Sequence, residues 1–179
     1  NRVVVAAEGV RENLRVLLVS GEPHAGERVW RNLLKSDAAV NLVHFTILRP
    51  PQKQDGTPIH QLSLIAFPTR ELFQQKIGEF QLIIFDRYAR QGVLPLIYFD
   101  NIAKYVRDGG AVLIAAGPDY ASPTSIWRTP LDGILPAEPT GDITERSFQP
   151  QLTEAGHRHP VTRNLEGSET DPPHWSRWF

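Results

Sequence analysis

The sequence predicts an α/β fold in which a mostly parallel sheet lies between layers of helices. Short apolar runs alternate four times with segments of helical periodicity between Leu14 and Ala116. Turn-forming residues follow these runs, as Ser20-Gly21 and Gly117-Pro118 do. Strands that are apolar throughout need cover on both faces, and crossover helices provide it in parallel sheets. Because such crossovers are right-handed, we expect a doubly wound sheet.

The first part of the chain supplies two strands, a helix and a long loop. The run Leu14–Val19 ends at a turn signal and is typical of a strand. Over His24–Lys35, apolar residues recur every four positions from Ala25 through Val29 to Leu33. Trp30 and Leu34 stand beside this stripe, and together they predict one helix face. Val40–Leu48 is a second strand, rich in β-branched and aromatic residues and ended by two prolines. The polar segment Gln52–Ser63 follows as a long loop, and we expect it to face a partner.

The next part repeats the alternation. A short helix is expected around Arg70–Ile77, and Gln81–Phe85 is a buried strand. A helix then begins at Pro95, which suits a first turn, and ends at the glycines after Asp108. Ala111–Ala116 is the last clear strand. We expect the runs at 14–19, 81–85 and 111–116 to be central in the sheet, because they are the most continuously apolar.

After Gly117 the periodicity weakens. Prolines at six positions between 118 and 150 exclude long helices there. Ser147–Thr153 is a candidate for one further strand. We divide the chain into a lead-in from a longer protein at 1–13, the α/β domain at 14–165, and a loop or tail at 166–179. The tail contains Trp175, Trp178 and Phe179, which we expect to pack on their own domain or on a partner.

Composition excludes several classes of protein. The 179 residues carry a formal charge of −1, which does not favour a nucleic-acid partner. No apolar run approaches the roughly 20 residues of a transmembrane helix. The chain has no cysteine, which excludes disulfides, thiolate metal sites and cysteine nucleophiles. It also begins without methionine, which suggests a piece of a longer protein.

Candidate binding residues follow the strands, since ligands of open α/β sheets bind at the carboxyl ends of the strands. After the first strand, Ser20, Gly21, Glu22 and His24 precede a helix whose free N–H groups could hold an anion. The alternative is a tight turn with a helix cap. Arg87 and Gly117 follow the other two central strands and are the remaining ligand-binding candidates.

Asp86, Asp119 and His159 are the candidates for catalysis. Asp86 and Arg87 form either a substrate clamp or a local ion pair. Asp119 is either a general base or a residue that stabilises its own turn. His157 and His159 have the spacing of two ligands on an extended segment, but no third ligand lies near them in sequence, so we expect neither a metal site nor another cofactor.

Several segments together resemble one family. The strand that ends at Ala116, with Gly117-Pro118 after it, resembles the strand and elbow of class I glutamine amidotransferase-like domains. The stretch His159–Leu165 is similar to a His-Pro-hydrophobic-Thr-x-x-Leu segment of trehalose-utilisation-type relatives. Further segments are similar to a group of uncharacterised bacterial membrane proteins that carry such a domain. They are Leu17–Pro23, Val43–Pro51, Ile83–Tyr88 and Tyr105–Gly110.

This resemblance spans about Leu14 to Leu165 and implies a flavodoxin-like topology. Active glutamine amidotransferases need a cysteine in a Gly-x-Cys-x-Gly elbow and a His-x-Glu pair. Here the elbow is Ala115–Asp119, and no glutamate stands two residues after His157 or His159. We therefore expect a pseudoenzyme, a soluble domain of a membrane protein that serves binding or assembly with the rest of its parent or with another protein.

Two alternatives remain open. One is a hydrolase or sugar-processing enzyme on the same fold that uses Asp86, Asp119 and His159. The other is a sensor that binds a small anion at Gly21–His24.

Overall fold

The computed structural model describes residues 13–21, 23–46, 68–90, 92–142 and 145–178. The chain divides into two compact units, with the boundary between Thr140 and Gly141. This boundary lies inside the range 14–165 that the sequence suggested as one domain. The predicted lead-in, except for Asn13, and the predicted loop at 52–63 lie outside the described residues.

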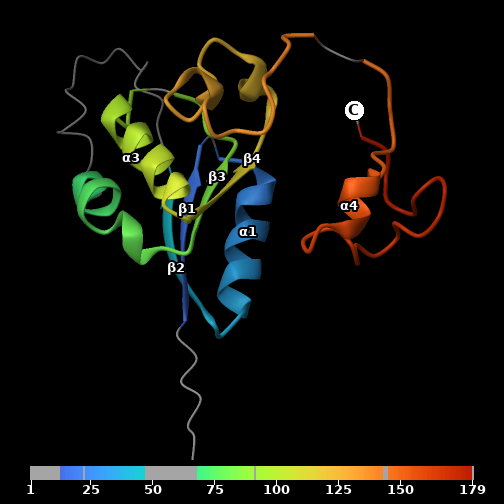
Figure 1. Cartoon of the computed structure of the whole chain (residues 1–179), viewed down its shortest axis with the longest axis horizontal. Coiled ribbons are helices and arrows are strands. Elements are labelled where there is room, and N and C mark those ends of the chain that lie inside the picture. Colours follow the sequence, from blue (N-terminus) through green and yellow to red (C-terminus); the bar gives the residue numbers. More distant parts are fainter. Residues whose placement is uncertain (1–12, 22, 47–67, 91, 143–144, 179) are drawn as a thin grey trace, which may run out of the picture. The chain divides into compact units, whose positions relative to one another are not determined.

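The first unit is built on a parallel sheet of four strands, which confirms the α/β class (Figure 1). Its strand order is β2-β1-β3-β4, as in a doubly wound fold. The strands are β1 at Leu14–Ser20, β2 at Val40–Thr46, β3 at Leu82–Asp86 and β4 at Ala111–Ala115. All four coincide with strands predicted from the sequence. The two central strands, β1 and β3, are apolar and buried along most of their length, as a sheet with helices on both faces requires.

The helices also follow the sequence pattern. The predicted short helix contains one π-helical turn, η1, followed by one 3-10 turn, η2. The helical elements are α1 at Ala25–Ser36, η1 at Glu71–Gln75, η2 at Ile77–Glu79, α3 at Leu96–Arg107, η3 at Pro118–Ala121, η4 at Ile126–Arg128 and α4 at Glu154–Arg158. Helix α3 begins after Pro95 and ends at Arg107, with Asp108 as its C-cap and Gly109 next at a φ of 104°.

The prediction that Ala111–Ala116 is a central strand is wrong. In the described part of the chain β4 is an edge strand, because the residues after it form the short turns η3 and η4 instead of a fifth strand. As a result Leu113 remains 41% exposed. The apolar composition of a strand predicts that the strand is buried. It does not predict how many further strands the sheet contains.

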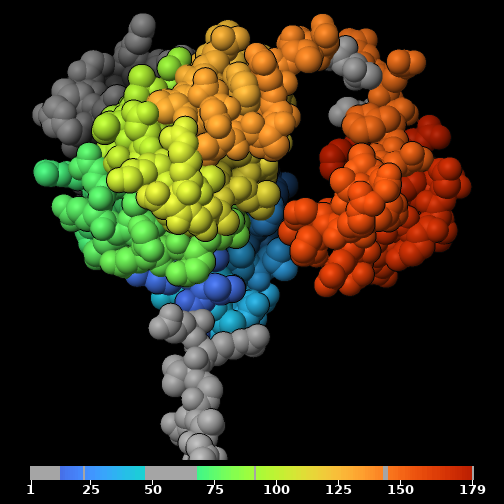
Figure 2. Space-filling view, in the orientation of Figure 1, coloured from blue at the N-terminus to red at the C-terminus, as the bar shows by residue number. Residues whose placement is uncertain are grey.

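The two faces of the sheet carry cores of very different size. On one face Phe73, Phe85 and Phe99 belong to a large cluster with η1, α3 and the segment after β4. Figure 2 shows the outer surface of this layer, with η1, η2 and α3 in green to yellow-green. On the other face the buried apolar residues of the described chain are only Val16, Leu18 and Ile84, with Trp30 and Leu34 of α1 packed against them.

Only part of the predicted apolar face of α1 is buried. The sequence suggested a stripe of Ala25, Val29 and Leu33, with two further apolar residues beside it. In the structure Trp30 and Leu34 pack against the sheet, whereas Val29 and Leu33 are 65% and 61% exposed. The helix carries two adjacent apolar stripes, and only the packing decides which of them is buried.

The second unit contains α4 and a set of turns. Its predicted strand at Ser147–Thr153 is reduced to one antiparallel bridge between Phe148 and Trp178, since Pro150 cannot donate to a ladder. The indole N–H of Trp175 donates to the Pro150 carbonyl at 2.8 Å. The terminal tryptophans therefore pack on residues 148–150 of their own unit.

No helix among the described residues is long and apolar enough to cross a bilayer.

Candidate functional site

Polar side chains gather where β1 and β3 end. The chain leaves β1 toward β2 on one side and later returns to β3 on the other, so the strand order reverses between β1 and β3 (Figure 1). Ligands of open α/β sheets bind at such a switch point. Ser20 and Asp86 are register partners at the ends of these two strands, and both residues are buried, with 0% and 1% exposure.

His24 and Asp86 form the first polar pair of this site. The His24 Nε2 and Asp86 Oδ2 atoms lie 2.7 Å apart. The other ring nitrogen, Nδ1, accepts from the Gly26 amide at 3.1 Å and so caps helix α1. Because Nδ1 is an acceptor, Nε2 carries the proton and donates to the carboxylate. Both nitrogens of His24 are thus committed to structural hydrogen bonds.

A second polar group connects β1, β2 and α1. The Ser20 Oγ atom lies 3.0 Å from His44 Nε2, and the Thr46 Oγ1 atom lies 3.1 Å from the same nitrogen. Thr46 in turn donates to Glu27 Oε1 at 2.8 Å. Burial lowers the pKa of His44, although Glu27 opposes this effect. A serine beside a neutral histidine is the pairing of a nucleophile with its base, but this hydroxyl has no exposed surface where a substrate could reach it.

Arg87 directly follows β3 and has a strained backbone. Its φ is 45°, in the left-handed region that non-glycine residues rarely adopt. The Arg87 carbonyl passes so close to Gly21 that a Cβ there would lie 2.0 Å from its oxygen. A Cβ on Gly117 would lie 2.8 Å from the Arg87 Nε atom. Both glycines are therefore needed to admit Arg87.

The side chain of Arg87 also has an unused donor. Its Nε atom is buried and has no hydrogen-bond partner within the described part of the chain. A buried N–H without an acceptor is costly, so such a group is an attractive position for a ligand oxygen. A guanidinium is suited to carboxylates and phosphates, which accept two parallel hydrogen bonds from it.

The three candidate catalytic residues have separate surroundings. Asp86 is bonded to His24, as described above. Asp119 lies in η3, where its backbone carbonyl accepts from the Ser122 amide and hydroxyl. His159 belongs to the second unit, is exposed, and accepts from the Val161 amide through Nδ1. Glu22, another binding candidate, lies outside the described residues.

No group of three histidine, aspartate or glutamate side chains among the described residues is arranged to hold a metal ion.

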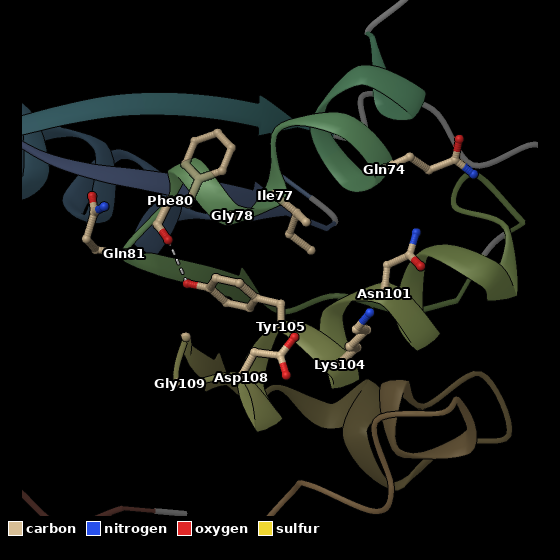
Figure 3. A pocket seen from close by; sticks show the side chains of 11 residues that line it. Gln74, Ile77, Gly78, Phe80, Gln81, Asn101, Lys104, Tyr105, Asp108 and Gly109 are labelled. Atoms are coloured by element: carbon tan, nitrogen blue, oxygen red, sulfur yellow. Dashed lines mark hydrogen bonds between the residues drawn. The ribbon is translucent and has the colours of Figure 1, made fainter.

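A hollow lies at the other end of the strands, near the start of β3 and β4 (Figure 3). It has a volume of about 690 Å³ and lies between η1, η2 and α3. The Tyr105 hydroxyl donates to the Phe80 carbonyl and accepts from the Ala111 amide next to it. Asn101 is likewise occupied, since it donates to the Phe73 carbonyl. No sequence motif indicates this hollow, because its lining is divided between η1, η2, one side of α3 and the residues that follow it.

No protein-family model, curated protein or solved structure matches this chain.

Proposed function

We propose that this chain is a non-catalytic domain of the class I glutamine amidotransferase-like type, which serves binding or assembly within a larger, membrane-anchored bacterial protein. The resemblance of several sequence segments supports the family, and the parallel sheet with order β2-β1-β3-β4 is compatible with its flavodoxin-like topology. Fold alone does not establish a function, which depends on the chemical groups of the site.

The observation that carries the proposal is that the reactive groups at the strand ends are buried or already bonded. The elbow after β4, where the family places its nucleophile, is Ala116-Gly117-Pro118 and offers none. Ser20 is fully buried, and both nitrogens of His24 are engaged. The enzyme alternative has less support, because Asp86 is bonded to His24 and not to another catalytic candidate.

The test is a glutaminase assay on the purified chain. We expect no ammonia release from glutamine above that of a heat-denatured sample, because no nucleophile can reach an amide carbon. Ser20→Ala is the informative variant, since Ser20 is the serine of the site and its hydroxyl lies 3.0 Å from His44 Nε2. Ammonia release that disappears in Ser20→Ala would overturn the proposal and establish a serine-dependent enzyme.

A second candidate, small-anion binding at the same strand ends, is favoured by the unused donor of Arg87. Thermal unfolding in the presence of inorganic phosphate or acetate tests it, with chloride at equal ionic strength as reference. A ligand that binds only the folded chain raises the free energy of unfolding by about 2.7 kcal/mol at 100 times its Kd. We expect this gain in the wild type and its loss in Arg87→Gln.

The matched control is Arg107→Gln, which removes the same charge from an exposed position at the end of α3. If both arginine variants respond to the anion like the wild type, or if both lose the response, Arg87 is not an anion site.

A further inference from the structure

Strand β4 has an edge to which no described residue is paired. Its residues Ala111–Ala115 include no charge, proline or glycine. Natural edge strands are usually protected by such residues or by a bulge, because an open ladder recruits other strands. The other edge strand, β2, does carry polar side chains at Asn41, His44 and Thr46. The composition of β4 is therefore that of a strand paired on both sides.

Two residues of β4 direct their backbone polar groups toward this open edge. The Ala115 carbonyl accepts from the Arg87 amide on the β3 side at 2.9 Å. Since hydrogen-bonding directions alternate along a strand, every second residue from Ala111 to Ala115 faces β3. Val112 and Ile114 consequently present their N–H and C=O groups to the open edge.

We propose that a second copy of this chain binds this edge, so that the two sheets join through β4 of each subunit. Identical surfaces meet across a twofold axis, and the two strands then run antiparallel. With the axis at Leu113, Val112 faces Ile114 of the partner subunit. This is a hydrogen-bonded pair on each side of the axis, so the open-edge groups of both strands satisfy one another.

The side chains of β4 fit the same register. The strand is Ala-Val-Leu-Ile-Ala, nearly the same in both directions, so antiparallel pairing places residues of similar size opposite each other. Leu113 then faces Leu113 of the partner subunit in the non-hydrogen-bonded pair at the axis, where side chains approach most closely. This side chain is 41% exposed in the single chain, and pairing removes apolar surface from water.

Sedimentation of the full 179-residue chain tests the proposal. A pair of five-residue strands is a small interface, so we expect reversible dimerisation with a Kd of about 1–100 μM. The mass should rise from 20.1 kDa toward twice that value with concentration. Leu113→Lys should weaken the dimer roughly tenfold or more, because it places like charges directly opposite each other.

The matched control is Leu96→Lys, an exposed leucine at the start of α3, which should dimerise like the wild type. Thermal melts monitored by circular dichroism confirm that each variant is folded. A chain that remains monomeric up to about 200 μM overturns the proposal, since this concentration lies above the expected Kd. So does a dimer that is equally stable in Leu113→Lys.

Cross-linking gives a second readout that needs no tight binding. The chain lacks cysteine, so a single introduced thiol is unambiguous. The Cα atoms of a non-hydrogen-bonded pair lie about 4.5 Å apart, within the range that a disulfide spans. Leu113→Cys should form a covalent dimer under mild oxidation much faster than Leu96→Cys. Equal rates would exclude the twofold axis at Leu113.

Discussion

His44 lies inside β2, with a ring nitrogen near polar groups of β1 and α1. Burial disfavours its protonated form and lowers the pKa of His44 below the ordinary 6.5. The Glu27 carboxylate, 3.6 Å away, acts against burial, as does Asp86. The charges of Arg31 and Lys35 act in the same direction as burial. As the pH falls below 6.5, the unfolded chain therefore binds a proton at this residue before the folded chain does.

This difference predicts a stability that depends on pH. Since the pKa is lower in the folded state, stability is lost as the pH falls from the unfolded value toward the folded one. We expect the urea midpoint of the wild type to be lower at about pH 5.5 than at about pH 7.5. His44→Gln should show a smaller difference between the two pH values.

The control for this prediction is His157→Gln, at an exposed position of the second unit. It should keep the wild-type pH dependence. An unchanged pH dependence in His44→Gln would mean that other groups cause the loss.

The position of residues along the chain predicted about half of the polar side chains at the ends of β1, β2 and β3. Ser20, His24, Asp86 and Arg87 follow strands directly, so the rule for strand ends identified them. Thr46 and its neighbours His44 and Glu27 were missed, because only the register of β1 with β2 places Thr46 beside Ser20. The strain at Arg87 was equally invisible, since no sequence pattern predicts a left-handed backbone at arginine.

Among the elements, α1 is covered on a narrow stripe only. No residue of this helix is fully buried, and its contact with the sheet depends on Trp30 and Leu34. The neighbouring Leu33 points away from this contact and is 61% exposed. Leu34 therefore contacts the sheet, whereas the adjacent Leu33 is exposed to solvent.

We expect Leu34→Ala to lower the free energy of unfolding by about 1–2 kcal/mol, less than for a fully buried leucine. Leu33→Ala should change it by less than about 0.5 kcal/mol, because it removes exposed surface and alanine favours a helix. Urea unfolding of both variants measures the difference. Equal losses would show that the exposed stripe is covered in solution.

Local sequence patterns predicted each strand of the sheet, but they did not predict which strands lie beside it. The apolar runs gave all four strands within one or two residues, because burial on two faces leaves a local signature. Whether β4 is central depends on a further strand elsewhere in the chain. The buried stripe of α1 similarly depends on the orientation of the helix on the sheet, and its own sequence leaves that orientation open.

At the scale of the whole molecule, each of the two units is stabilised by contacts among its own residues. The large and small cores are formed by residues of the first unit, from Val16 to Leu135. In the second unit, Gln149 donates to the carbonyls of Pro173 and Trp175, and Phe148 pairs with Trp178. The end of the chain thus holds the segment around Phe148 in place.

Deletion of Asp171–Phe179 should affect the second unit and leave the contacts of the first unit intact. We expect the amides around Phe148 to lose protection from hydrogen exchange, because their partners are removed. The amides of β1 and β3 should keep theirs, since the sheet and its cores remain intact. Hydrogen exchange followed by mass spectrometry on both chains measures this, and a loss of protection in β1 would contradict it.

The left-handed backbone of Arg87 has a consequence for any attempt to evolve this chain. A non-glycine residue in that conformation costs of order 1 kcal/mol or more, which glycine at the same position would avoid. A laboratory selection for heat resistance alone should therefore enrich glycine or asparagine at position 87. Such heat-resistant descendants would lack the guanidinium and its unpaired Nε donor. If the proposed anion site exists, selection for heat resistance would therefore remove it.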